Sequence, residues 1–237
     1  MADKNILIIG GSSGIGAALV QLLSQDKNFH VYTLSRQQPN FLPLPNVNFI
    51  TWDIRQVPTP ELLYQLPEVF HGLVYLPGTI NLKPFHRLTP ADFREEWEVN
   101  VLGAVTALQA FLPHLKRSGA AAVVLFSSVA AQTGMSFHAS TASAKAGVEG
   151  LAKALAAEWA SLKIRVNVIA PSLTDTPLAG NLLATPEKRE AANKRHPLGR
   201  TGTPSEIAAL TKFLISEEAG WLTGQIIAQD GGLSALR

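Results

Sequence analysis

Residues 5–23 read NILIIGGSSGIGAALVQLL, an apolar run followed by a glycine-rich turn and a helical pattern. The run 5–9 is typical of a buried strand, and 15–23 is typical of a helix. Glycines between them allow a tight turn and let the backbone approach a pyrophosphate closely. The helix N-terminus presents free N–H groups and a partial positive charge to such an anion. The stretch therefore predicts a strand, a turn and a helix arranged around a phosphate group.

Short apolar runs alternate with helical patterns along the rest of the chain. We expect further strands at 31–34, 47–51, 72–76, 121–126, 166–169 and 225–228, and further helices at 90–115, 141–160 and 204–215. Continuous apolar strands between helices are typical of a parallel sheet covered on both faces. With no internal repeat or linker, the sequence predicts one α/β domain over residues 1–237, with a doubly wound parallel sheet of about seven strands.

The composition is that of one globular domain, because 237 residues with 46% hydrophobic content can bury a large core. The net charge is +2 and no run of like charge occurs, so we expect neither nucleic acid nor a membrane as a partner. The absence of cysteine excludes disulfides, thiolate ligands and cysteine nucleophiles, and no metal site is expected. The early first strand leaves no room for a signal peptide, and no apolar run approaches the ~20 residues of a membrane span. We therefore expect a cytoplasmic protein.

Residues 125–150 read LFSSVAAQTGMSFHASTASAKAGVEG. This stretch resembles the active-site segment of the short-chain dehydrogenase/reductase family, in which a strand ends in Ser-Ser and a Tyr-x-x-x-Lys pattern opens a long helix. The resemblance extends from Ile6 to Gly232. It implies a Rossmann-like fold and an oxidoreductase that acts on a carbonyl or alcohol. By the same analogy, the helices 90–115 and 141–160 would join subunits into a homodimer or homotetramer.

The catalytic residues of the family match four positions of this chain. By the resemblance, Ser128 would orient the substrate carbonyl, and Asn100 would distort its helix and hold a water that links the lysine to solvent. Lys145 would hold the nicotinamide ribose. The fourth position is Thr141, where the family has its tyrosine acid. Because positions 141 and 145 are four residues apart, their side chains share one face of the helix.

A threonine hydroxyl is a poor substitute for the tyrosine acid. A phenol has a pKa near ~10 that a neighbouring ammonium can lower, whereas an aliphatic hydroxyl is a much weaker acid. A positioned general acid contributes roughly 10²–10⁴-fold, so the standard reaction should be slowed at least that much. His138 or a water could replace the phenol, although an ordinary loop histidine is favoured over a catalytic one. Tyr75, on a buried strand, is expected to serve packing.

The resemblance also implies the residues that hold a dinucleotide. Ser35 and Arg36 end the second strand, where a carboxylate would select NAD. A guanidinium can make bidentate bonds to a 2′-phosphate, so NADP is favoured and NAD is the less favoured cofactor. Asp53 and Ile54 would contact the adenine. The remaining implied contacts are Gly10, Ser12, Ser13, Gly14, Ile15, Gly16, Gly78, Lys145, Pro171, Thr174 and Thr176.

Two departures from the family leave two functions open. Besides Thr141, residues 75–78 read YLPG where the family has Asn-Asn-Ala-Gly, so two amides are missing. One hypothesis is an NADP-dependent oxidoreductase with an altered or water-mediated proton step. The other is a catalytically silent relative that binds NADP(H) as a sensor, or acts as an assembly partner. The long polar segment 172–196 is expected to be a functional or mobile substrate loop, but it does not identify a substrate.

Overall fold

The computed structural model describes residues 3–236 and contains one sheet of seven parallel strands. The strand order is β3-β2-β1-β4-β5-β6-β7. The strands are β1 (Lys4–Ile9), β2 (Phe29–Ser35), β3 (Val47–Thr51), β4 (Gly72–Tyr75), β5 (Ala121–Phe126), β6 (Ile164–Pro171) and β7 (Ile226–Gln229). The predicted doubly wound parallel sheet is thus confirmed.

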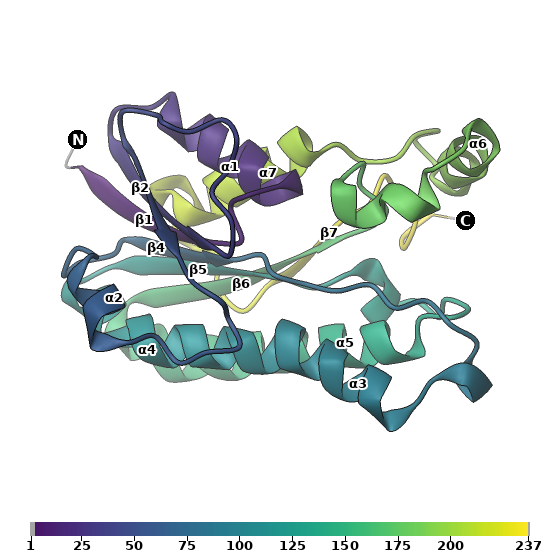
Figure 1. Cartoon of the computed structure of the whole chain (residues 1–237), viewed down its shortest axis with the longest axis horizontal. Helices are drawn as coiled ribbons and strands as arrows, with labels where there is room; N and C mark the ends of the chain where they lie inside the picture. Colours follow the sequence, from purple (N-terminus) through teal and green to yellow (C-terminus); the bar gives the residue numbers. More distant parts are fainter. Residues whose placement is uncertain (1–2, 237) are drawn as a thin grey trace.

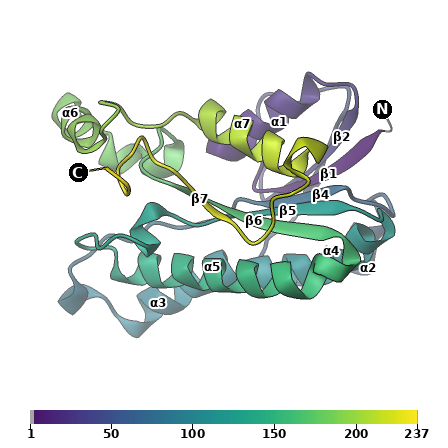
Figure 2. The ribbon, with the colours of Figure 1, turned by 180° about the vertical axis from the view of Figure 1, so that it is seen from behind.

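Helices cover both faces of this sheet, as Figure 1 shows and the view from behind in Figure 2 repeats. One face carries α1 (Gly14–Ser24) and α7 (Pro204–Ile215); the other carries α2 (Pro60–Tyr64), α3 (Pro90–Trp97), α4 (Gly103–Arg117) and α5 (Ala139–Trp159). Successive strand residues point to opposite faces. In β1, Leu7 and Ile9 therefore pack into the core beneath α4 and α5, whereas Ile6 and Ile8 pack into the core beneath α1 and α7.

Five helical segments begin at a Thr-Pro pair. Thr89 caps α3, since its hydroxyl accepts the Asp92 N–H. The same pair starts α2, α7, the 3₁₀ helix Pro177–Leu182 and α6 (Pro186–Arg195). The expectation of a loop over 172–196 is therefore wrong in part. A threonine cap and a proline at the first helical position start a helix even where the following residues are polar.

The predicted helix 90–115 is also corrected. It is divided into α3 and α4 by a π-helical turn at Glu98–Leu102, around Asn100. A π-turn inserts one extra residue into the helical hydrogen-bond pattern and is frequent at functional sites.

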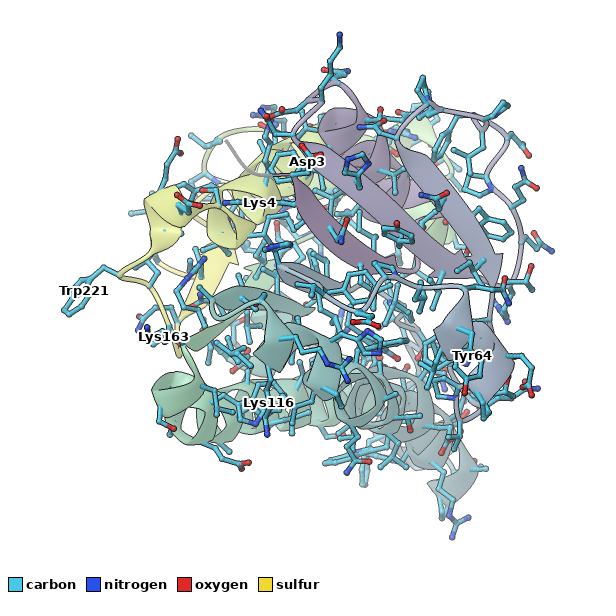
Figure 3. All side chains as sticks on the ribbon, turned by 90° about the vertical axis from the view of Figure 1, so that its left-hand side faces the viewer. Asp3, Lys4, Tyr64, Lys116, Lys163 and Trp221 are labelled. Carbon is cyan, nitrogen blue, oxygen red and sulfur yellow. The ribbon has the colours of Figure 1, made fainter. Side chains whose placement is uncertain are left out.

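The connections between strands place a crevice at the end of the sheet where the strands finish. From β1 the chain runs outward through β2 to β3, and it then crosses to β4 on the other side of β1. Such a reversal opens a crevice at the carboxyl ends of the strands. Figure 3 looks at the opposite end, where the fully exposed Trp221 extends from the surface.

Within residues 3–236, no helix is long and apolar enough to cross a membrane. The same residues contain no group of three or more His, Asp or Glu side chains placed to hold a metal ion.

Candidate active site

A cleft of about 990 Å³ opens along the carboxyl ends of the strands. Its walls come from the glycine turn after β1, the segments after β2, β3, β4, β5 and β6, and the start of α5. With the exception of the buried Asn100, it is lined by every site residue implied by the sequence: Gly10, Ser12, Ser13, Gly14, Ile15, Gly16, Ser35, Arg36, Asp53, Ile54, Gly78, Ser128, Thr141, Lys145, Pro171, Thr174 and Thr176.

The glycine turn has a backbone that depends on the absence of side chains. Gly10 and Gly14 have positive φ angles of 88° and 52°. A Cβ on Gly16 would lie 2.1 Å from the Gly10 carbonyl oxygen, so the turn closes only with glycine there. Ser13 is the N-cap residue of α1, but its side chain makes no capping hydrogen bond. The first N–H groups of the helix therefore remain available to an anion in the cleft.

Polar atoms converge on an open backbone at Gly78. A Cβ on Gly78 would lie 3.1 Å from Asn100 Oδ1 and 3.2 Å from Lys145 Nζ. Asn100 Oδ1 is buried and has no hydrogen-bond partner within residues 3–236. An ammonium and an amide oxygen beside a bare backbone suit the hydroxyl groups of a ribose. The residues present thus fit a dinucleotide that extends from the glycine turn to Lys145.

At the other end of the cleft, no carboxylate directly follows β2. Ser35 donates its hydroxyl to the Gln37 carbonyl at 2.9 Å, and the exposed Arg36 lines the wall. After β3, Asp53 accepts the Arg55 N–H at 3.0 Å, so its carboxylate caps that turn. The chain therefore presents a guanidinium at the point where a dinucleotide-binding fold places the groups that face the adenosine ribose.

Asn100 lies behind the cleft in the π-turn. The Gly103 N–H bonds to the carbonyl five residues back, which leaves the Val99 carbonyl free of its helical partner. The Tyr75 hydroxyl donates to that carbonyl at 2.6 Å. Burial raises the pKa of Tyr75, and its side chain does not line the cleft. Tyr75 therefore supports the helix backbone and is not placed to exchange a proton with a substrate.

Lys145 is a buried cation at the inner end of the cleft. Its ammonium donates to the Phe126 carbonyl, at the end of β5, at 2.9 Å. Burial lowers the pKa of Lys145 to about 8, although the Glu96 carboxylate opposes this shift. Ser128 lies beyond β5, and its hydroxyl accepts the Ala130 N–H at 3.2 Å.

Thr141 contacts a residue that was not predicted from the sequence. Its hydroxyl donates to Glu96 Oε1 at 2.9 Å and accepts the Asn81 N–H at 3.2 Å. Glu96 is only 1% exposed, and its Oε2 accepts from Thr79 Oγ1 at 2.8 Å and from Asn100 Nδ2 at 2.9 Å. The available signal was its position four residues before Asn100, which places both side chains on one helix face.

A second missed pair lies at the outer end of the cleft. Ser172 Oγ and His196 Nε2 are 2.9 Å apart, and His196 Nδ1 is 2.8 Å from the Ala192 carbonyl of α6. The segment 172–196 thus brings a hydroxyl and an imidazole to the cleft. Around them the lining is largely apolar, with Leu82, Met135, Leu173, Leu178, Leu182 and Leu233. His138 lines the cleft as well, and its Nδ1 lies 2.7 Å from the Ser136 carbonyl.

The buried Lys145 should make folding stability depend on alkaline pH. The pKa of Lys145 is about 8 in the folded protein, against an ordinary value of 10.5. Between pH 8 and pH 10.5 the unfolded chain therefore binds more protons than the folded protein, and the free energy of unfolding rises with pH through this range. Lys145→Met removes this rise, which we expect to be roughly 1–3 kcal/mol. Urea unfolding of both proteins at neutral and alkaline pH measures it. Lys153→Met, an exposed position on the same helix, is the control and should keep the rise. A stability difference between wild type and Lys145→Met that does not vary with pH would contradict this account.

An all-parallel sheet with a glycine turn at its point of reversal defines the class of nucleotide-binding α/β proteins. Residues 64–234 match the family model described as enoyl-(acyl carrier protein) reductase. The chain belongs to the short-chain dehydrogenase/reductase family.

Two curated relatives and one solved structure are similar over nearly the whole chain. A tropinone reductase homologue of Arabidopsis thaliana is 35% identical, covering 99% of this chain and 94% of that protein. The cis-4-hydroxycyclohexanecarboxylate dehydrogenase of Sinomonas cyclohexanicum is 37% identical, covering 99% and 98%. ElxO, solved with NADP bound, is 25% identical with a TM-score of 0.88, covering 98% of each chain.

Proposed function

We propose that the protein is an NADP-dependent oxidoreductase acting on a carbonyl or alcohol substrate. The observation that carries the proposal is the placement of Ser128, Thr141 and Lys145 at one end of the cleft that contains the glycine turn. Relatives that are named as a reductase homologue and a dehydrogenase support it, as does ElxO with its bound NADP.

Each part of the cleft has a role in this proposal. The glycine turn and the N-terminus of α1 bind the pyrophosphate. Arg36 binds the 2′-phosphate, and Lys145 binds the nicotinamide ribose. NADPH, when bound, supplies the hydride. Ser128 orients the substrate oxygen, and the proton step passes through Thr141. Asp53 and Ile54 contact the adenine, whereas Pro171, Thr174 and Thr176 border the nicotinamide.

We further propose that residues 1–237 form one nucleotide-binding domain in which 172–196 selects the substrate. The protein would act in the cytoplasm as a homodimer or homotetramer, joined through α3, α4 and α5. Sedimentation velocity of the purified protein tests the oligomeric state, and a monomer at all concentrations would contradict it.

The guanidinium of Arg36 should decide between the two cofactors. Charge-assisted hydrogen bonds contribute about 1.5–3 kcal/mol, so Arg36→Ala should weaken NADPH binding by roughly 10–100-fold. NADH has no 2′-phosphate, and its Kd should change less than about twofold. Arg36→Lys keeps the charge without the bidentate geometry, so its Kd for NADPH should lie between those of the wild type and Arg36→Ala. Equal losses for NADPH and NADH would reject the 2′-phosphate contact.

Tryptophan fluorescence can report the binding itself. Trp52 lines the cleft, whereas Trp221 is fully exposed at the end of the molecule where the strands begin (Figure 3). Titration of Trp221→Phe with NADPH should therefore show quenching against a lower background. Absence of binding by either cofactor would contradict the proposal.

A protein that binds NADP(H) without turnover is the second candidate. The observation in its favour is that the hydroxyl hydrogen of Thr141 is directed to Glu96 and away from the cleft. Micromolar binding with no oxidation or reduction across a broad panel of alcohols, aldehydes and ketones would select this function.

A further inference from the structure

A buried carboxylate lies directly behind the cleft wall, and the function proposed above does not use it. Glu96 does not line the cleft, yet it contacts Thr141, which does. Removing an ionised carboxylate from water costs several kcal/mol unless hydrogen bonds and opposite charge compensate it. Here three side chains donate to it, and the Lys145 ammonium acts on it across the site. The carboxylate is thus held in place by three hydrogen bonds.

The hydrogen bonds around Thr141 have a definite direction. A hydroxyl has one hydrogen and two lone pairs. The Asn81 N–H occupies one lone pair, and the hydrogen goes to Glu96 Oε1, because an ionised carboxylate can only accept. One lone pair remains on a residue that lines the cleft. Toward a substrate, Thr141 therefore presents an acceptor.

The two oxygens of Glu96 have different partners. Oε2 is held by Thr79 and by the side-chain amide of Asn100, from the π-turn that follows α3. Oε1 has Thr141 as its side-chain donor within residues 3–236. The hydroxyl of Thr141 is thus connected to a basic oxygen whose orientation is set by the other end of the same carboxylate.

We propose that Glu96 is the terminal proton acceptor of this site and that it acts through the Thr141 hydroxyl on an alcohol substrate. The O–H bond of the alcohol breaks and its proton goes to Thr141 Oγ1, while the Thr141 proton goes to Glu96 Oε1. The C–H electron pair leaves as hydride, for which the oxidised nicotinamide of the proposed function is the acceptor, and a C=O bond forms. In carbonyl reduction the same two proton transfers run in reverse. Glu96 does not touch the substrate and is a positioning residue in this relay, which rests on the proposed function.

In this arrangement two residues together carry out the proton transfer for which the family uses one tyrosine phenol. A threonine hydroxyl reaches the cleft but is a weak acid and a weak base, whereas a carboxylate is basic but lies behind the wall. The charged group that faces Glu96 is Lys145, from α5. One turn earlier in α3, Asp92 is engaged by Lys83 and Asn81.

Glu96→Gln tests the relay because it keeps the shape of the side chain and removes the basic oxygen. The probes are cyclohexanol, cis-4-hydroxycyclohexanecarboxylate and a panel of secondary alcohols, oxidised with NADP⁺. We expect kcat to fall at least about 100-fold, while KM and the Kd of NADPH, measured at a pH where Lys145 is protonated in both proteins, stay nearly unchanged. Thr141→Val breaks the relay at its other member. The double variant should be no more than about threefold slower than either single one.

The pKa of Lys145, measured without cofactor, distinguishes the loss of the Glu96 charge from a change in the shape of the site. Removing the Glu96 anion should lower the pKa of Lys145 further, and pH-dependent acetylation of Lys145, followed by mass spectrometry, measures it. Thr141→Val should leave that pKa in place. Glu98→Gln is the matched control, because Glu98 lies two residues after Glu96 in the chain and does not line the cleft. This variant should keep the wild-type rate and pH profile.

The outcomes distinguish the two proposals. Turnover by the wild type with an unchanged rate and pH profile in Glu96→Gln overturns the relay and leaves the oxidoreductase intact. Absence of turnover by the wild type, despite NADPH binding, overturns the oxidoreductase and the relay with it.

Discussion

Replacing Gly16 by alanine should weaken NADPH binding by at least about 100-fold. The added Cβ would lie 2.1 Å from the Gly10 oxygen, 2.9 Å from the Gly10 carbonyl carbon and 3.0 Å from the Gly11 Cα. All three are backbone atoms, so no flexible side chain can move aside and the turn must open. An opened turn displaces the N–H groups of α1 from the position in which they bind a pyrophosphate.

Gly150→Ala is the matched control for this change. Gly150 lies in α5, and apart from its chain neighbours and the backbone of its own helix no heavy atom of the described residues lies within 4 Å of the position of an added Cβ. Alanine there should keep the Kd of NADPH and add up to about 1 kcal/mol of stability from helix propensity. Isothermal titration gives the affinity, and urea unfolding gives the stability. If Gly16→Ala binds NADPH as tightly as Gly150→Ala, the glycine turn is not the pyrophosphate site.

Thr141→Tyr should create or greatly raise NADPH-dependent carbonyl reduction. A phenol on the cleft wall, one helical turn from Lys145, is a much stronger acid than a threonine hydroxyl, and a positioned acid contributes roughly 10²–10⁴-fold. Steady-state reduction of an aldehyde and ketone panel measures the gain.

Thr141→Phe adds the same ring without the hydroxyl and serves as its control. The gain should be absent in Thr141→Phe, which separates acid catalysis from filling of the cleft. In the Thr141→Tyr background, Glu96→Gln should no longer slow the reaction, because the phenol makes the carboxylate relay unnecessary. If Thr141→Tyr reduces no member of the panel faster than Thr141→Phe does, the pocket has diverged beyond that one position.

The sheet was predictable because its signals are local. The runs 47–51 and 121–126 and the helix 204–215 have the predicted bounds in the structure. A short buried strand needs only a continuous apolar run between turns. By contrast, α2 was missed, since its five residues are too few for a periodic pattern, although Thr59 and Pro60 mark its start.

The interruption of the long helix illustrates a different limit. Side-chain periodicity continues through 90–115, and a π-turn changes it by one residue only. The Val99 carbonyl, which loses its helical partner in the π-turn, instead accepts a hydrogen bond from the Tyr75 hydroxyl of β4. No sequence neighbour of Asn100 indicates that partner, because β4 lies more than twenty residues away along the chain.

The sequence by itself determined the alternation of strands and helices, the glycine turn after β1 and the spacing of Thr141 and Lys145, all of which are set by contacts within a few residues. Only the tertiary structure decided what surrounds Thr141. Glu96 lies in the segment REEWE, which is typical of a solvated helix face, and its burial arises because α3 packs against α5. The pairing of Ser172 with His196 likewise depends on α6, whose Ala192 carbonyl lies next to the His196 ring. A side chain's burial and its partners are properties of the packed layers, so local pattern cannot specify them.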